Sequence, residues 1–400
     1  MHKPMALRKP FWTPGVLVMV AFMVAGAVAI LARFTGGIGY VANLSTARPW
    51  GLWVGVDVAT GVALAAGGFT TAAVAHIFGR HAYEPVTRPA LLTAVLGYTF
   101  VVLGLIVDIG RSWAIWKPMF NWNTNSVLFE VAMCVMCYLN VLYLEFFPIV
   151  AEQFKGNVNL PGPLALLNGL VDDILHIGDA IIDKIMWALI ILGVVLSCMH
   201  QSSLGSLMLI APTKLHPLWY TPILPPLLFL TSAFAVGYPM VVFETTIATS
   251  SFKLDSEMNI LTPLTRITIF LLGFYMVLKI GDMAVRGTWI YLLDGTAQSN
   301  AFVAELVLGV ILPWLMLLSS QIRASRKGLF IAATLIVAGV VLNRINVFIV
   351  GFKPPLSDPG YFPSIGEMMV TFGLIATLMF IYKIAVTYLP VLQASQEVSR

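Results

Sequence analysis

The chain has 400 residues, of which 59% are hydrophobic and only 10% charged, with a mean hydropathy of +0.89 and a formal net charge of +4. A soluble domain carries about a quarter charged residues, so this composition excludes a soluble globular protein. The small positive charge is spread over loops, which argues against a nucleic-acid partner. The apolar runs are long and continuous, as in helices rather than barrel strands, and they predict an all-α integral membrane protein.

Ten apolar segments follow one another along the chain and are long enough to cross a bilayer. We predict membrane helices at 14–33, 50–76, 90–110, 126–150, 184–203, 222–245, 263–283, 300–320, 329–349 and 367–389. The first is kept as a mature helix, because Arg33-Phe34-Thr35 lacks the small residues of a signal-peptide cleavage site.

Lysine and arginine set the expected orientation. With both termini inside, 14 of the 23 basic residues fall on the inner side and the other 9 on the outer side. The outer set includes Lys279, and also Arg111 and Arg344, which abut helix ends. We therefore predict a multi-pass protein of the bacterial cytoplasmic membrane with both termini cytoplasmic.

A faint internal repeat predicts two related units. Asn125 and Glu130 open the fourth helix, and Asn300 and Glu305 open the eighth, 175 positions later. We predict an N-terminal helix and outer loop at 1–49, a first four-helix bundle of helices 2–5 at 50–203, a second bundle of helices 6–9 at 204–350, and a C-terminal helix and tail at 351–400. Helices 1 and 10 would be peripheral, and the loop 151–183 is predicted to hold an amphipathic helix on the inner surface.

Polar groups gather at one end of helices 2–5. Asp57 lies two turns into the second helix, Asp108 ends the third, Glu130 opens the fourth and His200 ends the fifth. All four helix ends face outward, so these groups share one depth. Charge is costly in lipid, and carboxyl groups beside an imidazole indicate proton chemistry at a small-molecule site. For Asp108 and Arg111, at i and i+3, a simple structural ion pair is the alternative.

The residues that hold redox cofactors are sparse. His76 and His200 fall on opposite membrane faces, and the chain lacks a CxxCH motif. Three cysteines are too few for an iron–sulfur cluster and are interpreted as packing residues. We therefore expect no heme, iron–sulfur cluster or other metal site in this chain. The tryptophans of the outer loop 111–124 form either an interfacial aromatic belt or a docking surface for a partner.

Seven ordered strings resemble a known family: PWGLWVGVD (49–57), GVALAAGGF (61–69), RPALL (88–92), DIGRSW (108–113), NSVLFE (125–130), MHQSSLGSLM (199–208) and HPLW (216–219). They resemble the membrane subunit of uptake nickel–iron hydrogenases, the HybB-type branch of the NrfD/polysulfide-reductase family. The resemblance implies a subunit without heme that receives electrons from a periplasmic four-cluster ferredoxin-like iron–sulfur subunit. It also implies nickel–iron hydrogenase large and small subunits as partners, and menaquinone or ubiquinone as the membrane substrate in the outer half of the bundle.

Under this resemblance the polar residues receive hypothetical roles. Glu130 and Asp108 handle quinone protons, His200 or Asp57 hydrogen-bonds a quinone carbonyl, and Arg111 holds the carboxylates and stabilises charge on a reduced quinone. Trp53 and Tyr98 pack the ring, and Ser126, Gln201 and Ser203 complete the binding set. An inward proton path would use Asn140, Tyr143, Glu145, His76 and Glu244.

Other functions stay open. A secondary transporter would also have ten helices, a repeat and buried charge, but its site usually lies at mid-bilayer. An inert anchor would explain docking loops but not Glu130 near Asp108. The same family also serves other catalytic partners, such as a molybdopterin oxidoreductase or a cytochrome c complex.

Overall fold

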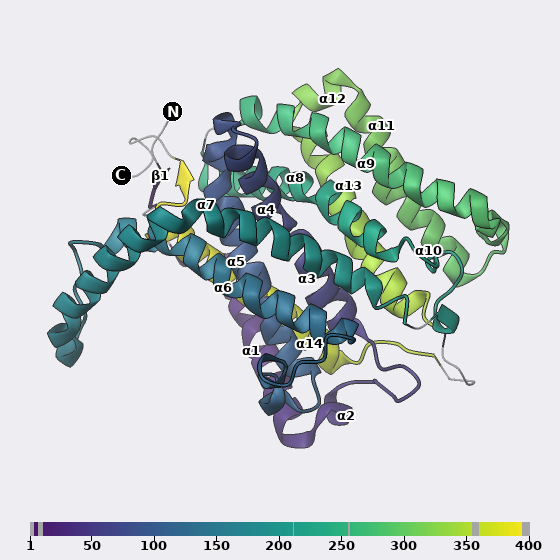
Figure 1. Cartoon of the computed structure of the whole chain (residues 1–400), viewed down its shortest axis with the longest axis horizontal. Helices are drawn as coiled ribbons and strands as arrows, with labels where there is room; N and C mark the ends of the chain where they lie inside the picture. The colour runs from purple at the N-terminus through teal and green to yellow at the C-terminus, as the bar shows by residue number, and fades with distance from the viewer. Residues whose placement is uncertain (1–3, 7–10, 211, 255–256, 354–359, 394–400) are drawn as a thin grey trace.

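The computed structural model describes residues 4–6, 11–210, 212–254, 257–353 and 360–393, and it is almost entirely helical (Figure 1). Ten helices of the described chain are long and apolar enough to cross a membrane, which confirms the predicted all-α membrane class. The uninterrupted ones are α1 (Pro14–Gly36), α5 (Glu84–Asp108), α6 (Val127–Phe154), α7 (Asn168–Ser206), α8 (Pro225–Phe252), α9 (Met258–Arg286) and α14 (Ile365–Tyr388).

Three spans contain π-helical turns. Helix 2 comprises η1 (Trp53–Thr60), α3 (Gly61–Leu64), α4 (Ala66–Ala72) and η2 (Ala73–Ile77); helix 8 comprises α10 (Ala297–Leu306), η9 (Val307–Ile311) and α11 (Leu312–Leu318); helix 9 comprises α13 (Arg326–Ile345) and η10 (Asn346–Val350). Short helices lie between the spans: α2 (Ile38–Val41), η3 (His81–Tyr83), η4 (Ser112–Ala114), η5 (Lys117–Met119), η6 (Gly162–Leu167), η7 (Pro212–Lys214), η8 (Thr288–Leu293) and α12 (Ser320–Ala324).

Helix 2 lies at the centre of the molecule. In its most apolar window, 89% of the residues are buried. Small residues permit this, because a Cβ atom on Gly68 would lie 2.5 Å from the Ala94 Cβ of α5, and one on Gly67 would lie 3.2 Å from the Gly237 carbonyl oxygen of α8. In lipid, such close approach supplies the packing that holds helices together.

Contacts between the spans join helix 2, α5, α6 and α7 in one ring, and α8, α9, helix 8 and α13 in another. The second ring contains a close crossing, where a Cβ on Gly309 would lie 2.4 Å from the Gly339 Cα. Helix α8 also packs against α7 and α4 and so connects the two rings. The division of the chain into two related bundles stays a prediction.

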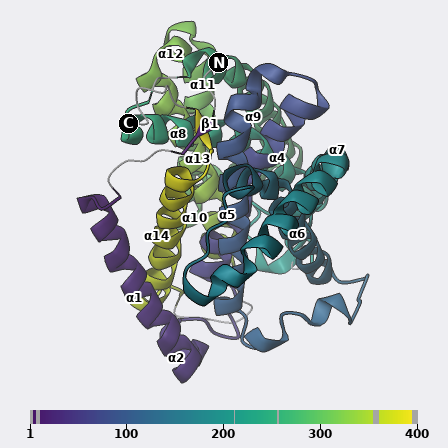
Figure 2. The same ribbon diagram turned by 90° about the vertical axis from the view of Figure 1, so that its left-hand side faces the viewer.

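Helices α1 and α14 pack side by side (Figure 2), with Gly26 and Gly373 at their crossing. Helix α14 also contacts α5 and η1, and its Glu367 and Val370 are fully buried. Helix α14 therefore contacts the first ring through α5 and helix 2.

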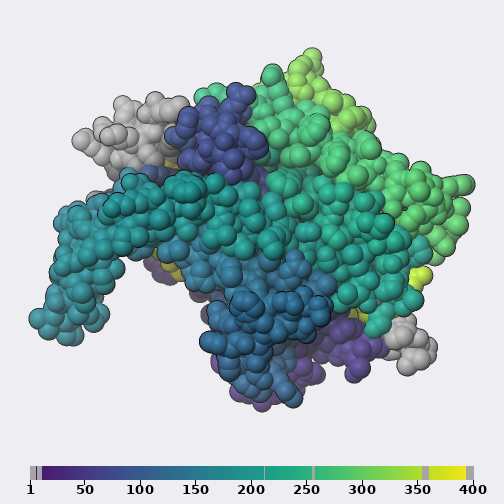
Figure 3. Space-filling view, in the orientation of Figure 1, coloured from purple at the N-terminus to yellow at the C-terminus, as the bar shows by residue number. Residues whose placement is uncertain are grey.

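The segment predicted as a separate amphipathic surface helix continues into the fifth span. Helix α7 has 39 residues, which corresponds to roughly 58 Å against a bilayer core of about 30 Å. Its N-terminal part projects from the helix bundle (Figures 1 and 3). Inside an unbroken helix the backbone N–H and C=O groups are hydrogen-bonded to one another. The segment whose acidic and apolar faces predicted a separate helix therefore lengthens the fifth span instead.

The two ends of the chain lie together. Strand β1 (Pro4–Met5) pairs antiparallel with β2 (Leu392–Gln393). This pairing agrees with an even number of spans between them. That this side is cytoplasmic stays a prediction.

Candidate functional site

The polar residues predicted at the ends of helices 2–5 do lie at the end of the bundle away from the termini, and other helices add to them. They fall into three groups. The carboxyl group set comprises Asp57, Asp108, Glu367, Thr371, Tyr361 and Arg33; the Glu130 set comprises Glu130, Ser203, His200 and Tyr98; the Glu305 set comprises Glu305, Lys279, Asn343, Asn346, Trp219 and Arg344.

Asp57 lies in the π-helical turn η1 between α5 and α14. Its Oδ2 accepts a hydrogen bond of 2.7 Å from the Thr371 hydroxyl. Gly104 leaves room for it, since a Cβ there would lie 3.1 Å from the Asp57 Cβ. Asp108 follows one turn further along α5 and interacts electrostatically with Asp57. Two carboxyl groups from two helices therefore face one region of the bundle.

The cation beside Asp108 comes from α1. Arg33 is only 5% exposed, and its Nε and Nη2 each donate a 2.6 Å hydrogen bond, to the carbonyl oxygens of Val107 and Ile109. It thus caps the carboxyl end of α5 and interacts with Asp108. Arg111 is exposed, and it forms no ion pair with Asp108 in the part of the chain that the structure describes. Arg33, and not Arg111, is the basic side chain bound at this end of α5.

Glu367 organises the start of α14 next to this pair. Its Oε1 accepts from the Tyr361 hydroxyl at 2.5 Å, and its Oε2 accepts from the Ser364 backbone N–H at 2.9 Å. Burial, and then the hydrogen bond to Glu367, raises the pKa of the Tyr361 hydroxyl, which remains protonated and donating. The indole N–H of Trp53 donates to the Glu367 carbonyl at 3.2 Å. Trp53 is 1% exposed, so its ring is packed inside the protein rather than facing a ligand.

Glu130 differs from these acids because it is exposed on the surface of α6. The Glu130 Oε1 accepts a hydrogen bond of 2.7 Å from the Ser203 hydroxyl of α7. Ser126 caps the start of α6, since its side chain accepts from the Phe129 N–H at 3.3 Å. One turn along α7, His200 Nδ1 lies 3.3 Å from the Tyr98 hydroxyl, and both side chains are buried. Glu130 is therefore the accessible acid of its set.

Gln201 joins α7 to helix 2 beside this set. Its Nε2 donates to the Val62 carbonyl at 2.8 Å, and its Oε1 is buried without a partner. Gln201 thus positions helix 2 and offers one unused acceptor.

The predicted proton-path residues do not lie along one face. Glu145 is 9% exposed and faces Gly193 of α7, whereas Asn140 and Tyr143 lie on the exposed face of the same helix. Asn140 donates to the Met136 carbonyl at 2.8 Å, and the Tyr143 hydroxyl lies 2.9 Å from that of Thr99. His76 is exposed near the end of helix 2, and Glu244 lies on α8 with its carboxyl bonded to Tyr382.

The stretch between His200 and Glu145 is filled by two tyrosines that the sequence did not link. The rings of Tyr98 and Tyr138 stand edge to face with centroids 4.6 Å apart. Both are fully buried, and Tyr138 interacts electrostatically with Glu145. The hydroxyl-bearing rings, and not Asn140 or Tyr143, occupy the interior of the first ring of helices.

The Glu305 set is a buried ion-pair network that sequence reasoning missed. Lys279 pairs with Glu305, and the carboxylate also accepts from Trp219 Nε1 at 2.9 Å. The amide groups of Asn343 and Asn346 donate to it at 2.8 and 2.9 Å. Four donors therefore surround one carboxylate, which is the condition under which a buried charge is tolerated.

Arg344 completes this network. Its guanidinium donates to Asn343 Oδ1 at 2.6 Å and to the Ser232 hydroxyl at 2.9 Å, and it lies 3.9 Å from the centre of the Phe229 ring. Lys279 and Arg344 were counted with the charges of the outer side, but the structure buries both between helices. The signal that could have found them is a charged residue within each apolar run, together with the Asn-x4-Glu repeat at Glu305.

π-Helical turns accompany these groups. Asp57 lies in η1, η9 begins two residues after Glu305, and η10 begins with Asn346. A π-turn widens the helix and re-aims its side chains, and such turns occur often at functional sites. A Cβ on Gly55 of η1 would lie 3.7 Å from the Phe348 Cβ of η10, so the two π-helical turns pack together. They lie between the carboxyl group set and the Glu305 set.

Comparisons with known proteins agree with this architecture. The family model described as "Polysulphide reductase, NrfD" matches residues 40–354. A protein of Nitratidesulfovibrio vulgaris is 36% identical over 96% of both chains. The "Probable Ni/Fe-hydrogenase 2 b-type cytochrome subunit" of Escherichia coli is 31% identical, over 98% of this chain and 95% of that protein. The "Menaquinone reductase, integral membrane subunit" of N. vulgaris is 25% identical, over 97% of this chain and 93% of that protein.

Proposed function

The chain belongs to the NrfD polysulfide reductase family, whose members include membrane subunits of redox complexes, and from this premise we propose that it passes electrons between an iron–sulfur partner and membrane quinone. The observation that carries the proposal is two carboxyl groups at one end of the bundle: Asp57, which accepts from Thr371, and Asp108, at the end of α5 that Arg33 caps. Such a pair suits a substrate that takes up protons with its electrons. A relative named as a menaquinone reductase subunit supports quinone as that substrate.

Reduction of a quinone to a quinol consumes two electrons and two protons, and oxidation returns them. The electrons come from, or go to, the partner subunit. Asp108 and Glu130 exchange the protons, Asp57 holds a quinone oxygen by a hydrogen bond, and Arg33 offsets the negative charge of the acids. Glu130 is exposed, whereas His200 and Tyr98 are buried, so we assign His200 and Tyr98 to positioning behind the site.

We further propose that the partner is a periplasmic four-cluster ferredoxin-like subunit of a nickel–iron hydrogenase. The hydrogenase subunit among the relatives supports this choice. Trp113 and Trp122 in the loop beyond α5 are 76% and 71% exposed, at the same end as Asp108, and offer a docking surface. In this arrangement the termini are cytoplasmic and the membrane is the bacterial cytoplasmic one. The second candidate is a different catalytic partner on the same subunit, which the menaquinone reductase relative favours.

Glu130→Gln is the direct test of the surface acid. We expect quinone-coupled turnover of the membrane complex to fall by about 10²-fold or more, because a positioned acid–base group contributes on this scale. Reduction of an artificial dye by the catalytic partner should persist. The matched control is Glu152→Gln, an exposed acid at the other end of α6, which should leave both activities unchanged. Normal quinone turnover in the Glu130 variant would remove this residue from the mechanism.

The name of the E. coli relative raises heme, and the residues of this chain do not fit a pair of axial histidines. His200 is buried against Tyr98 near one end of the helices, and His76 is exposed near the other end. We expect an alkaline pyridine hemochrome assay of the purified chain to show far less than one heme b per chain. A near-stoichiometric heme b spectrum would contradict the expectation.

We propose that protons reach the site from the terminus side through Glu145, Tyr138 and Tyr98, in place of Asn140 and Tyr143. Turnover would then respond to membrane potential, at roughly 2.3 kcal/mol per charge per 100 mV. In sealed proteoliposomes, quinone reduction should change with imposed potential, and Glu145→Gln should abolish this dependence. Tyr143→Phe, on the exposed face, should retain it. Equal rates with and without potential in the unmodified protein would mean that the route is structural.

A further inference from the structure

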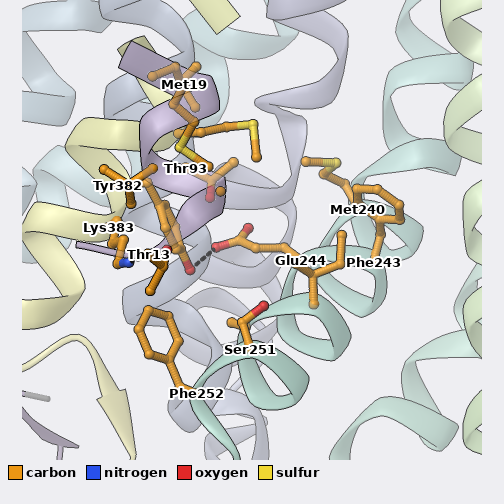
Figure 4. A pocket seen from close by; sticks show the side chains of 16 residues that line it. Thr13, Met19, Thr93, Met240, Phe243, Glu244, Ser251, Phe252, Tyr382 and Lys383 are labelled. Atoms are coloured by element: carbon orange, nitrogen blue, oxygen red, sulfur yellow. Dashed lines mark hydrogen bonds between the residues drawn. The ribbon is translucent and has the colours of Figure 1, made fainter. Parts of the chain in front are cut away.

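A cavity lies on the terminus side of the helices, away from Asp57 and Asp108. It has a volume of about 360 Å³, is lined by α1, α5, α8 and α14, and is open on one side. Figure 4 shows its lining. Most of the wall is apolar and includes Met19, Met240, Phe243, Met379 and Phe252. A volume of this size, mostly apolar and with a few polar groups, is typical of small-molecule sites.

The polar part of the wall is compact. The Tyr382 hydroxyl donates to Glu244 Oε1 at 2.8 Å, and these two side chains point toward each other across the cavity (Figure 4). Thr93 of α5 also lines this part of the cavity (Figure 4). Glu244 lies eight residues before the end of α8, or about 12 Å along the helix, which places it inside the bilayer. A carboxyl group bonded to a phenol hydroxyl, with the Thr93 hydroxyl in the same wall, therefore lies in a mostly apolar space.

The basic side chain in the cavity lining, Lys383, bonds to groups other than Glu244. Lys383 lines the cavity edge, but its Nζ donates to the Phe11 carbonyl at 2.7 Å and lies 3.5 Å from the Thr13 hydroxyl. Figure 4 shows it beside Thr13. Among the residues that the structure describes, Glu244 forms no ion pair. The cavity thus presents an acidic acceptor without a basic partner, so an anionic lipid phosphate would be repelled.

Among small molecules that reside in a bilayer, the kind that fits this cavity is a flat apolar ring that carries hydroxyl groups. A plain acyl chain would leave the three oxygen-bearing side chains facing hydrocarbon, which is costly. The phenolic hydroxyl of a hydroquinone can donate to Glu244, and its oxygen can accept from Tyr382 or Thr93. Methionine and phenylalanine side chains pack well against such a ring.

We propose that this cavity is a second binding site, specific for the head group of a membrane hydroquinone, with Glu244 as its acceptor. This inference rests on the proposed function in one respect, namely that the ligand is a membrane quinone in its reduced form. The site is separated from Asp57 and Asp108 by most of the length of helix α14, because Tyr382 lies 15 residues after Glu367, or roughly 22 Å. The two sites can therefore be tested independently.

The experiment uses the full chain in nanodiscs and a menaquinol analogue that carries a diazirine on its first isoprenoid unit and is kept reduced. After illumination, labelled peptides are mapped by mass spectrometry. We expect saturable labelling within 240–252 and 378–383, competed by unlabelled menaquinol. Ala248→Phe, which fills the cavity from its wall, should reduce this labelling at least tenfold. Glu244→Gln keeps the cavity volume and should also weaken the labelling. This variant is the alternative test if Ala248→Phe does not fold.

Labelling that is confined to peptides around Glu130 or Asp108 would overturn the second site and leave the proposed function intact. Labelling at the cavity that added phospholipid displaces and menaquinol does not would assign the cavity to lipid and overturn the proposal. Labelling at the cavity alone, with none near Asp108, would support the second site and count against the proposed one. Leu227→Phe, exposed near the start of α8 and outside the cavity lining, is the control for a change of side-chain volume on the same helix.

Discussion

Asp108→Asn is expected to lower quinone-coupled turnover of the assembled membrane complex by about 10²- to 10⁴-fold, the usual contribution of a positioned acid–base group. Asparagine keeps the size and polarity of the side chain but cannot exchange a proton. Arg33 would keep its hydrogen bonds to the Val107 and Ile109 carbonyls, so α5 should still end in the same way. The measurement is donor-dependent quinone reduction in membranes, beside dye reduction by the catalytic partner.

The matched control for this variant is Asp172→Asn, a partly exposed acid on the projecting part of α7. Its quinone-coupled rate should equal that of the unmodified protein. Asp57→Asn should reduce turnover as well, since Asp57 and Asp108 face the same region. Full activity of the Asp108 variant at unchanged assembly would show that the acids of helices 2 and 3 serve only packing.

Lys279→Met is expected to destabilise the protein by about 3–5 kcal/mol, because it leaves the buried Glu305 carboxylate without its cation. Trp219, Asn343 and Asn346 would still donate to the carboxylate, but none of them carries charge. The double variant Lys279→Met with Glu305→Gln removes both charges at similar volume and should recover much of the loss. The free energy of unfolding is measured by titration with denaturing detergent, followed by tryptophan fluorescence.

The control for this comparison is Lys155→Met, which removes the cation of a partly exposed ion pair with Asp179. A pair open to solvent contributes about 1 kcal/mol or less, so this variant should unfold almost like the unmodified protein. Equal effects of Lys279→Met and Lys155→Met would contradict a network stabilised by the buried ion pair.

Prediction from sequence succeeded where lipid leaves few choices. Low charge and long apolar runs leave only membrane helices, and the ten predicted spans match the ten helices. Because a membrane helix has a fixed direction, the chain order also determined that Asp57, Asp108, Glu130 and His200 lie toward one end. The same argument placed Glu145 and Glu244 toward the other end.

Rotation about each helix axis could not be determined in this way. Membrane helices are apolar on all sides, so hydrophobic periodicity does not tell which face turns inward. Glu145 was therefore grouped with Asn140 and Tyr143, although the structure buries the first and exposes the other two. For the same reason Lys279 and Arg344 were counted with the outer charges, while both are buried inside the second ring of helices.

The sequence by itself determined the class of protein, the number of spans and the end of each span at which a polar group falls, because lipid thickness and backbone hydrogen bonding impose these. Only the tertiary structure decided the partners at that depth. It brought Arg33 of α1 to Asp108, and Thr371 of α14 to Asp57, across 75 and 314 positions of chain. Such pairs depend on which helices pack together and on the small residues at their crossings, and that information is not contained in any single apolar segment.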